Sequence, residues 1–269
     1  AHAFLPLDTP RLPDFHQRLT TLTAPLTPGE RQWLLQAPAL KAPDPVSFFK
    51  LRSLRAFPQR LRTLIEESAE IALSRGAVAP AATTSVTTHV PKPEGGTRPI
   101  GLFTEILKRI EALVADRLTR AAADAPSGAF LSGFNTAYTK QESTDSIHGL
   151  IRLLMEADFL CELGIIWLLG DYHKWFDIIR REITMAKLDA VGVPSETCRF
   201  LAAIYEDQKC RQATYYGLSA GRVRGPAGFA QGLPGSTLWS LLAQDPLWVL
   251  IAEELDRPGG GAEAYRVRA

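Results

Sequence analysis

The sequence predicts an α+β fold, in which helices and strands follow one another without a regular βαβ repeat. Apolar residues recur at helical spacing in several separate stretches, for example over 106–118. β-Branched residues gather instead over 83–90, which is typical of a strand. With 269 residues, 46% of them hydrophobic, the chain is long enough for one large globular unit or two small ones.

The region up to residue 80 is predicted to be a helical extension of the rest. Residues 1–50 are rich in proline, and only a short helix is expected there, near 28–36. A stronger helix opens at Pro58, because proline suits a first helical turn. Gly76 and Pro80 end it.

A β-hairpin followed by helices is predicted for residues 81–150. The strands are expected over 83–90 and 98–102, with a glycine turn between them. Thr104 is predicted to cap the next helix, and a further helix is expected over 143–156.

Residues 151–269 begin with an almost unbroken apolar run at 164–170, which predicts a buried strand over 165–169. Helices are expected from about 178 and from 195 to about 207, and then a hairpin over 212–224. Gly232 and Pro234 precede a long predicted helix, and residues 263–269 are expected to begin a strand.

Bulk composition excludes several classes of protein. The net charge is only +1, so nucleic-acid binding would need a local basic patch. The three cysteines are far apart, which indicates free thiols rather than disulfides or a zinc site. No apolar run is long enough to span a bilayer, so no membrane partner is expected.

The predicted hairpin carries the first group of candidate binding residues. Lys92 and Arg98 flank the turn at Gly95 and Gly96. Cationic side chains at a glycine turn could hold a triphosphate, since the backbone there can approach a ligand closely. An ordinary surface turn with solvated charges would have the same composition.

The second group follows the predicted buried strand. Asp171 comes directly after the apolar run, where a side chain leaves the core, and its carboxylate could hold a divalent metal. Asp177 lies at the start of a helix, where an acidic residue favours the helix dipole, so a structural role is preferred for it. Trp175 and Phe176 by themselves would be interpreted as core aromatics.

The third group is the segment 228–236, "GFAQGLPGS". Its glycines and proline force a tight entry into the long helix. Gln231 then presents an amide at the mouth of that helix, as a hydrogen-bond donor to a nucleotide. A loop that leads into a Ser-capped helix is the structural alternative.

Taken in this order, the three segments resemble the reverse transcriptases, most closely those of non-LTR retrotransposons. "VPKPEGGTRPIGL" is similar to the first finger segment, "DYHKWFDII" to motif A and "GFAQGLPGST" to motif B, which matches at every fixed position. Trp175 replaces a small residue of motif A. The segment 131–147 lacks the family's arginines, and 41–54 lacks a glycine and an aspartate of a further motif. The resemblance spans about residues 41–250.

The resemblance implies a right-hand polymerase, with fingers over 81–150 and a partial palm over 151–269. It also implies template-directed transfer of dNTPs to a primer 3′-hydroxyl, with an RNA template, a primer–template duplex and Mg²⁺ (or Mn²⁺) as partners. An intracellular location, with the nucleus as one such place, would go with that activity.

The resemblance also assigns roles to residues. Asp171 would bind both metals, helped by the carbonyl of Tyr172. Phe176 would lie under the sugar and exclude a 2′-hydroxyl, while Gln231 and Gly232 would line the incoming nucleotide. Lys92 and Arg98 would hold its phosphates. Lys108 and Arg109 would meet the template backbone, although a solvated helix face is the preferred interpretation of that pair.

One Asp cannot hold two cations, and the family supplies a second carboxylate from an Asp-Asp motif after motif B. No Asp-Asp pair follows Gln231 here. The chain is therefore expected to be a fragment that ends before that motif and before the thumb, inactive by itself. A non-catalytic module that binds RNA or a primer–template is the second hypothesis. A viral RNA-dependent RNA polymerase is a distant third, disfavoured by the bulk of Phe176.

Overall fold

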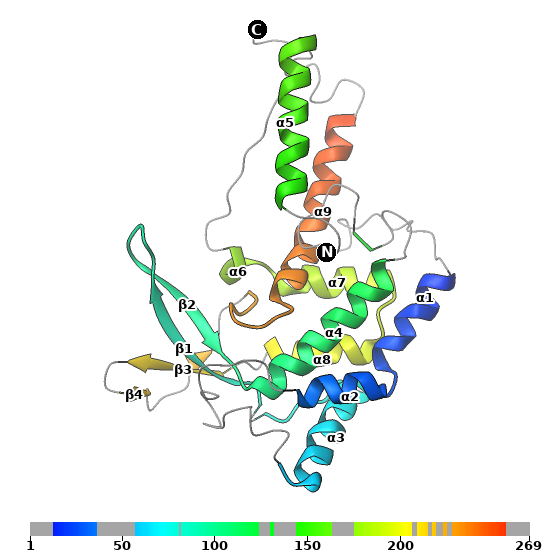
Figure 1. Cartoon of the computed structure of the whole chain (residues 1–269), viewed down its shortest axis with the longest axis vertical. Helices are drawn as coiled ribbons and strands as arrows, with labels where there is room; N and C mark the ends of the chain where they lie inside the picture. Colours follow the sequence, from blue (N-terminus) through cyan, green and yellow to red (C-terminus); the bar gives the residue numbers. More distant parts are fainter. Residues whose placement is uncertain are drawn as a thin grey trace.

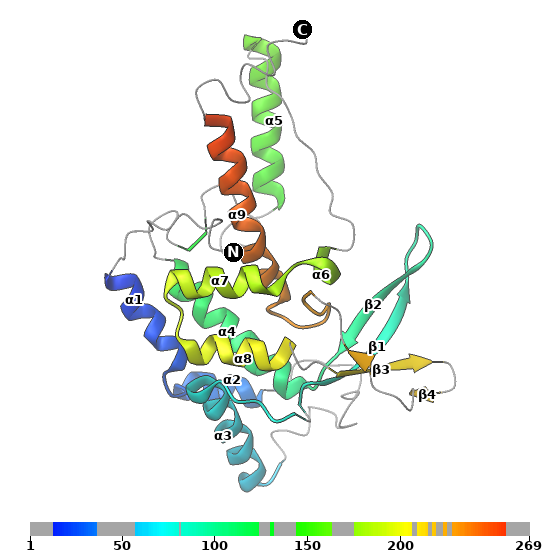
Figure 2. The ribbon, with the colours of Figure 1, turned by 180° about the vertical axis from the view of Figure 1, so that it is seen from behind.

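A computed structural model gives the fold of the chain (Figure 1). It describes residues 13–36, 57–80, 82–123, 130–131, 144–162, 175–205, 209–214, 217–218, 223–224 and 228–256. In these ranges helices form the body, and a β-hairpin projects from one side of it (Figures 1 and 2). The predicted α+β class is confirmed.

Short helices form the N-terminal part. They are α1 (Pro13–Leu19), the 3-10 turn η1 (Thr20–Thr23), α2 (Pro28–Leu35) and α3 (Gln59–Arg75). Thr27 and Glu30 form a capping box at the start of α2, in which each side chain accepts a hydrogen bond from the other residue's backbone N–H. Gly76 ends α3 in a left-handed conformation, with φ of 66°. The two predicted helices of this region are confirmed, but α1 and η1 lie in the stretch 1–50, where no other helix was predicted.

The sheet is built on the predicted hairpin. Strands β1 (Thr84–Pro91) and β2 (Thr97–Leu102) pair antiparallel, and Gly95 and Gly96 take the positive φ angles of 96° and 77° that their turn requires. The other strands are β3 (Lys209–Thr214), β4 (Gly217–Leu218) and β5 (Val223–Arg224). The five strands have the order β2-β1-β3-β4, and β5 also pairs with β3.

The predicted hairpin over 212–224 is confirmed only in part. β3 and β5 pair antiparallel, but through Lys209 and Cys210 of β3, whereas Ala213 and Thr214 pair with β4, in the stretch that was predicted as the turn. The small antiparallel sheet expected for this fold is present in the pair of β1 and β2. The sheet is not antiparallel throughout, because β1 and β3 run parallel, with Thr84 opposite Lys209. A parallel pair needs a long crossover connection. The helices between these two strands supply it.

The remaining helices are α4 (Glu105–Ala123), α5 (Thr144–Cys161), α6 (Trp175–Ile178), α7 (Arg181–Val191), α8 (Ser195–Tyr205) and α9 (Ser236–Asp256). Thr104 caps α4 as predicted, since its Oγ1 accepts a hydrogen bond of 3.4 Å from the Leu107 amide. Helix α5 continues to Cys161, past its predicted end near 156. The strands predicted over 165–169 and 263–269 lie outside the described residues, and the domain boundaries at 80 and 150 stay predictions.

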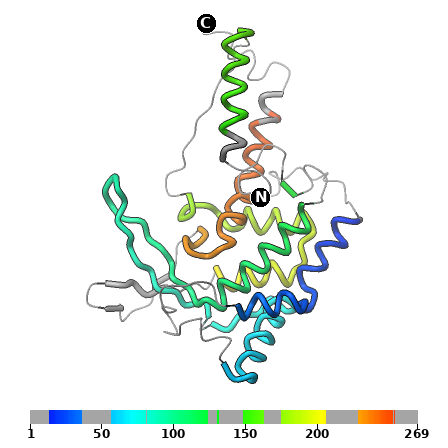
Figure 3. The backbone as a smooth tube through the Cα atoms, viewed as in Figure 1, coloured from blue at the N-terminus to red at the C-terminus, as the bar shows by residue number. Residues whose placement is uncertain are grey.

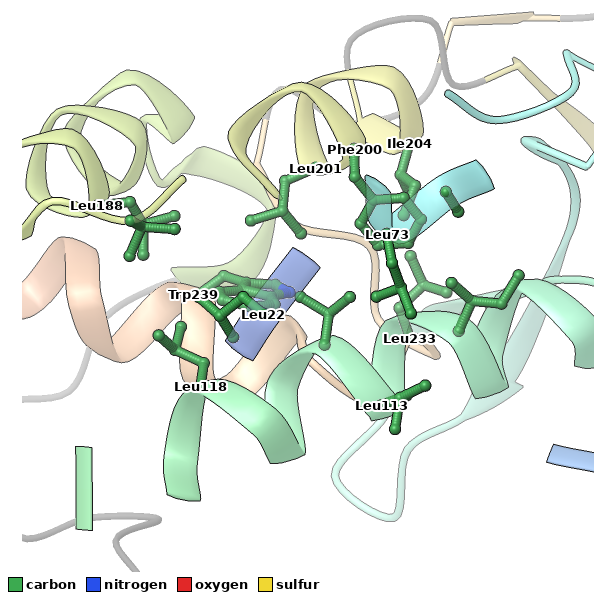
Figure 4. Packing of buried hydrophobic residues seen from close by; sticks show 14 of the residues in the cluster. Leu22, Leu73, Leu113, Leu118, Leu188, Phe200, Leu201, Ile204, Leu233 and Trp239 are labelled. Carbon is green, nitrogen blue, oxygen red and sulfur yellow. The ribbon is translucent and has the colours of Figure 1, made fainter. Parts of the chain in front are cut away.

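One hydrophobic cluster joins the N-terminal helices to those that follow. Helix α4 runs through it, with α1, α2 and α3 packed against α4 and with α8 packed against α3 (Figure 3). Figure 4 shows Trp239 and Leu233 among the leucines of α4, α7 and α8, and Trp239 is fully buried. The loop that leads into α9 is therefore fixed on the core by the packing of these two side chains.

Helices α5 and α9 extend away from this body (Figures 1 and 2). Large apolar side chains are exposed on α5, among them Phe159 at 85% and Leu160 at 77%. Within the described ranges, no helix has the length and apolar character needed to cross a membrane.

A buried arginine attaches the N-terminal part to α4. The Arg117 guanidinium is 5% exposed, and it donates to both carboxylate oxygens of Glu30, at 2.8 and 2.7 Å. It also donates to the backbone carbonyls of four residues, Thr21, Leu22, Ala24 and Pro25. A planar guanidinium suits this task, since its five N–H groups point in fixed directions.

The Arg117–Glu30 pair predicts a specific dependence of stability on pH. The hydrogen bond from Arg117 holds the pKa of Glu30 at about 2, below its ordinary 4.5. Because the folded-state pKa is the lower one, ionised Glu30 stabilises the fold above pH 4.5, and this contribution is lost as pH falls towards 2.

The test compares the urea unfolding of the wild type with that of Glu30→Gln across this range. The wild type should be more stable at neutral pH, and the difference should shrink between pH 4.5 and 2. Glu196→Gln, which alters an exposed pair on α8, is the control and should show a much smaller difference. A gap between wild type and Glu30→Gln that stays constant with pH would contradict the assignment.

Candidate functional site

The segment 228–236, here called the glycine loop, touches the end of strand β2. The Gly101 amide donates a hydrogen bond of 2.7 Å to the Gln231 carbonyl. Gly232 has a φ of 123°, and a Cβ atom there would lie 2.1 Å from the Gly101 carbonyl oxygen. Only glycine allows the two backbones to approach this closely.

The same loop touches α6 on its other side. The Gly228 amide donates to the Asp177 carbonyl at 3.0 Å, and a Cβ atom on Gly228 would lie 2.0 Å from the Phe176 carbonyl oxygen. Arg181 Nε donates to the Gly228 carbonyl at 2.8 Å, and its guanidinium also donates to the Tyr205 carbonyl. The loop therefore lies between the hairpin and α6, as Figures 1 and 2 show from opposite sides.

A buried carboxyl group supports the loop from within the core. Glu111 of α4 is fully buried, and its Oε2 accepts a hydrogen bond of 3.1 Å from the Gly235 amide. Its Oε1 accepts from Trp239 Nε1 at 2.9 Å and from the Tyr205 hydroxyl at 2.5 Å. Ser236 Oγ donates to the Ala230 carbonyl at 2.7 Å and lies 3.2 Å from the Tyr205 hydroxyl.

Burial shifts the pKa values of Glu111 and of its partner Tyr205. Desolvation raises the pKa of Glu111, and the hydrogen bonds from Tyr205, Trp239 and Gly235 oppose that rise. Burial beside Glu111 also raises the pKa of Tyr205 well above its ordinary value. The Tyr205 hydroxyl is therefore protonated at neutral pH and can donate a hydrogen bond.

Glu111 is not among the site residues predicted from the sequence. A signal was present, because Glu111 lies four residues after Leu107 and three before Val114, on the apolar face of α4. A carboxylate on such a face is rarely left without hydrogen-bond donors. Its donors could not be identified, since they come from residues more than ninety positions away.

The hairpin presents the two predicted phosphate-binding residues. Arg98 is exposed on β2, three residues before Gly101, which corresponds to about 10 Å along a strand. Lys92 lies at the other side of the turn, with its Nζ 3.9 Å from the Glu94 carboxylate. Both cations are thus on the hairpin whose strand β2 meets the glycine loop at Gly101, and their roles in phosphate binding stay predictions.

Phe176 is half-buried in α6, whose backbone meets Gly228, and Gln231 is half-buried at the contact with Gly101. Asp171 and Tyr172, predicted to hold the metal, lie outside the described residues. In the part that the structure describes, no three His, Cys, Asp or Glu side chains are grouped as metal ligands. These residues alone do not supply a site for Mg²⁺ or Mn²⁺.

The structure contradicts both roles that were considered for Arg109. It is neither a template contact nor part of a solvated face, because it is 7% exposed and donates to the Trp33 and Leu34 carbonyls at 2.6 and 3.0 Å. Its guanidinium also lies 5.6 Å from the centre of the Trp33 ring. Arg109 therefore binds the C-terminal end of α2. Lys108 is half-buried, 3.9 Å from Glu105.

Comparison with known protein families finds none that matches this chain, and comparison with curated proteins finds no match either.

The close approach at Gly232 predicts a large effect of a single methyl group. Gly232→Ala should lower the free energy of unfolding by about 2–4 kcal/mol, because it adds left-handed strain and a clash with Gly101. Gly149→Ala is the matched control, since Gly149 is in α5 with nothing within 4 Å of its Cβ position. That control should be neutral or slightly stabilising. Equal melting temperatures for the two variants would refute the contact.

Proposed function

We propose that this chain forms the fingers and part of the palm of an RNA-directed DNA polymerase, which transfers dNTPs to a primer 3′-hydroxyl on an RNA template. The observation that supports it most is the contact of the glycine loop with both β2 and α6. These contacts join the three segments on which the resemblance to reverse transcriptases rests, although Gly101, Phe176 and Gln231 are far apart in the sequence.

The geometry suits a nucleotide held between the hairpin and the loop. The exposed guanidinium of Arg98 can form charge-assisted hydrogen bonds with phosphate oxygens. Gln231 lies on a loop whose backbone is bonded on both sides, so the backbone from which its side chain extends has a fixed position. Groups held in place in this way lose little entropy when the substrate binds.

The metal chemistry in this proposal rests on the sequence alone. Mg²⁺ or Mn²⁺ bound at Asp171, with the Tyr172 carbonyl, would activate the primer hydroxyl and stabilise the leaving pyrophosphate. The short helix α6 begins four residues after Asp171.

A module that binds RNA or a primer–template without synthesis is the alternative. Equilibrium binding of fluorescent dNTPs to the purified chain, with an RNA template and a DNA primer present, separates the two functions. The polymerase proposal expects the dNTP complementary to the template base to bind more tightly than the other three. Binding of the duplex without any such preference would favour the module, and no binding of either ligand would overturn both.

Arg98 is expected to contribute to binding of the triphosphate. Loss of a charge-assisted hydrogen bond costs about 1.5–3 kcal/mol, so Arg98→Ala should weaken dNTP binding about tenfold or more. Arg152→Ala is the control, because Arg152 is an equally cationic residue on α5 that is 82% exposed and pairs only with Glu156 among the described side chains. A Kd for dNTP that is the same in both variants would remove the role of Arg98.

Phe176 is expected to discriminate between sugars. Its aromatic ring follows Asp171 by five positions, and the proposal places it under the ribose. Phe176→Val should lower the Kd for a ribonucleotide relative to the Kd for the matching dNTP. Ile178→Val, on the exposed side of α6, should leave the ratio unchanged. An unaltered ratio in Phe176→Val would show that the ring is not the sugar gate.

A further inference from the structure

We propose that Glu111 is the positioning residue of the nucleotide site, because it holds the glycine loop on the end of β2 and thereby fixes where Gln231 and Gly232 lie. The link to nucleotide binding rests on the proposed function. The attachment of the loop itself can be measured without it.

The two carboxyl oxygens accept hydrogen bonds from two different parts of the loop's base. Oε2 accepts from the Gly235 amide, inside the loop, and Oε1 accepts from the indole N–H of Trp239, in the first turn of α9. A Cβ atom on Gly235 would lie 2.4 Å from Trp239 Nε1 and 3.0 Å from Glu111 Oε1. The space between the two donors and the carboxyl group therefore leaves no room for a side chain at position 235.

A second set of hydrogen bonds leads from Glu111 to the residue before Gln231. Tyr205 of α8 bonds Oε1 with its hydroxyl, which lies 3.2 Å from Ser236 Oγ, and Ser236 in turn donates to the Ala230 carbonyl. In the neutral acid the proton on Oε1 can be donated to Tyr205, Tyr205 can donate to Ser236, and Ser236 still donates to Ala230. In the carboxylate Tyr205 donates to Oε1 instead. Both forms therefore keep acceptors for the two N–H groups.

A carboxyl group is the side chain that satisfies this arrangement. Glutamine has one acceptor oxygen and one donor NH₂, so one of the two N–H groups, that of Gly235 or that of Trp239, would face another donor. A buried donor left without an acceptor costs far more than one exposed to water. An apolar side chain at position 111 would be easier to bury, but it would leave both N–H groups without partners. This is why an acidic residue occupies the apolar face of α4.

The experiment measures amide hydrogen exchange of the full chain in the wild type, Glu111→Gln, Trp239→Phe and the double variant. In Glu111→Gln the amides of 228–236 should exchange about tenfold faster or more, while those of β1 and α3 stay unchanged. Trp239→Phe removes the indole donor. In the Trp239→Phe protein, Glu111→Gln should therefore increase the exchange rates of the loop amides by a several-fold smaller factor than in the wild type. This difference between backgrounds separates a paired contact from a general loss of packing.

Tyr205→Phe supplies a milder variant, which keeps the ring and removes one donor to Glu111. It should raise exchange of the same loop amides by a smaller factor, and it keeps the test open if Glu111→Gln fails to fold. Unchanged exchange in the loop, or an equal increase over all helices, would overturn the proposal for Glu111.

Ligand binding by the same variants is measured well below their unfolding temperatures. Glu111→Gln should weaken binding of the dNTP complementary to the template base, with the Kd for the RNA–DNA duplex unchanged. Equal weakening of both ligands would overturn the positioning role. If the wild type binds no dNTP, the polymerase function fails, and the exchange measurements still decide whether Glu111 holds the loop.

Discussion

The arrangement of the candidate site depends on the hydrogen bonds that the carboxyl group of Glu111 accepts. This carboxyl group is fully buried, and burial is unfavourable for such a group unless donors surround it. The donors come from α8, from the glycine loop and from the start of α9, so satisfying this one side chain requires all three to meet on α4. Displacing any of them would leave a buried polar atom without a partner.

Two buried arginines of α4 also hold other segments of the chain by hydrogen bonds. Arg117 bonds carbonyls of η1 and of the chain that follows it, and Arg109 bonds those at the end of α2. Both guanidinium groups are more than nine-tenths buried. Three ionisable side chains of one helix thus fix different segments of the chain, and each of them forms hydrogen bonds to backbone groups of those segments. Such contacts give orientation as well as stability, because hydrogen bonds have direction and apolar contacts do not.

Backbone proximity is the second constraint at the site. Gly228 and Gly232 allow the loop to lie against α6 and β2 through main-chain hydrogen bonds. A binding site formed from backbone contacts is rigid, since main-chain atoms have no rotamers to adopt. The side chain of Gln231 then remains available to a ligand, while its carbonyl is engaged by Gly101. This division of roles within one residue supports its proposed part in nucleotide binding.

The sequence by itself determined the features that depend on neighbouring residues. The capping box of α2, the glycine that ends α3, the turn of the hairpin and the N-cap of α4 all arise from interactions within a few positions, which is why the helices and the hairpin could be predicted. Tertiary structure decided the parallel pairing of β1 with β3, the burial of Arg109 and the partners of Glu111. Each of these joins residues more than seventy positions apart. A periodic pattern shows that a face is apolar, but only the folded chain determines which donors reach a polar group placed on it.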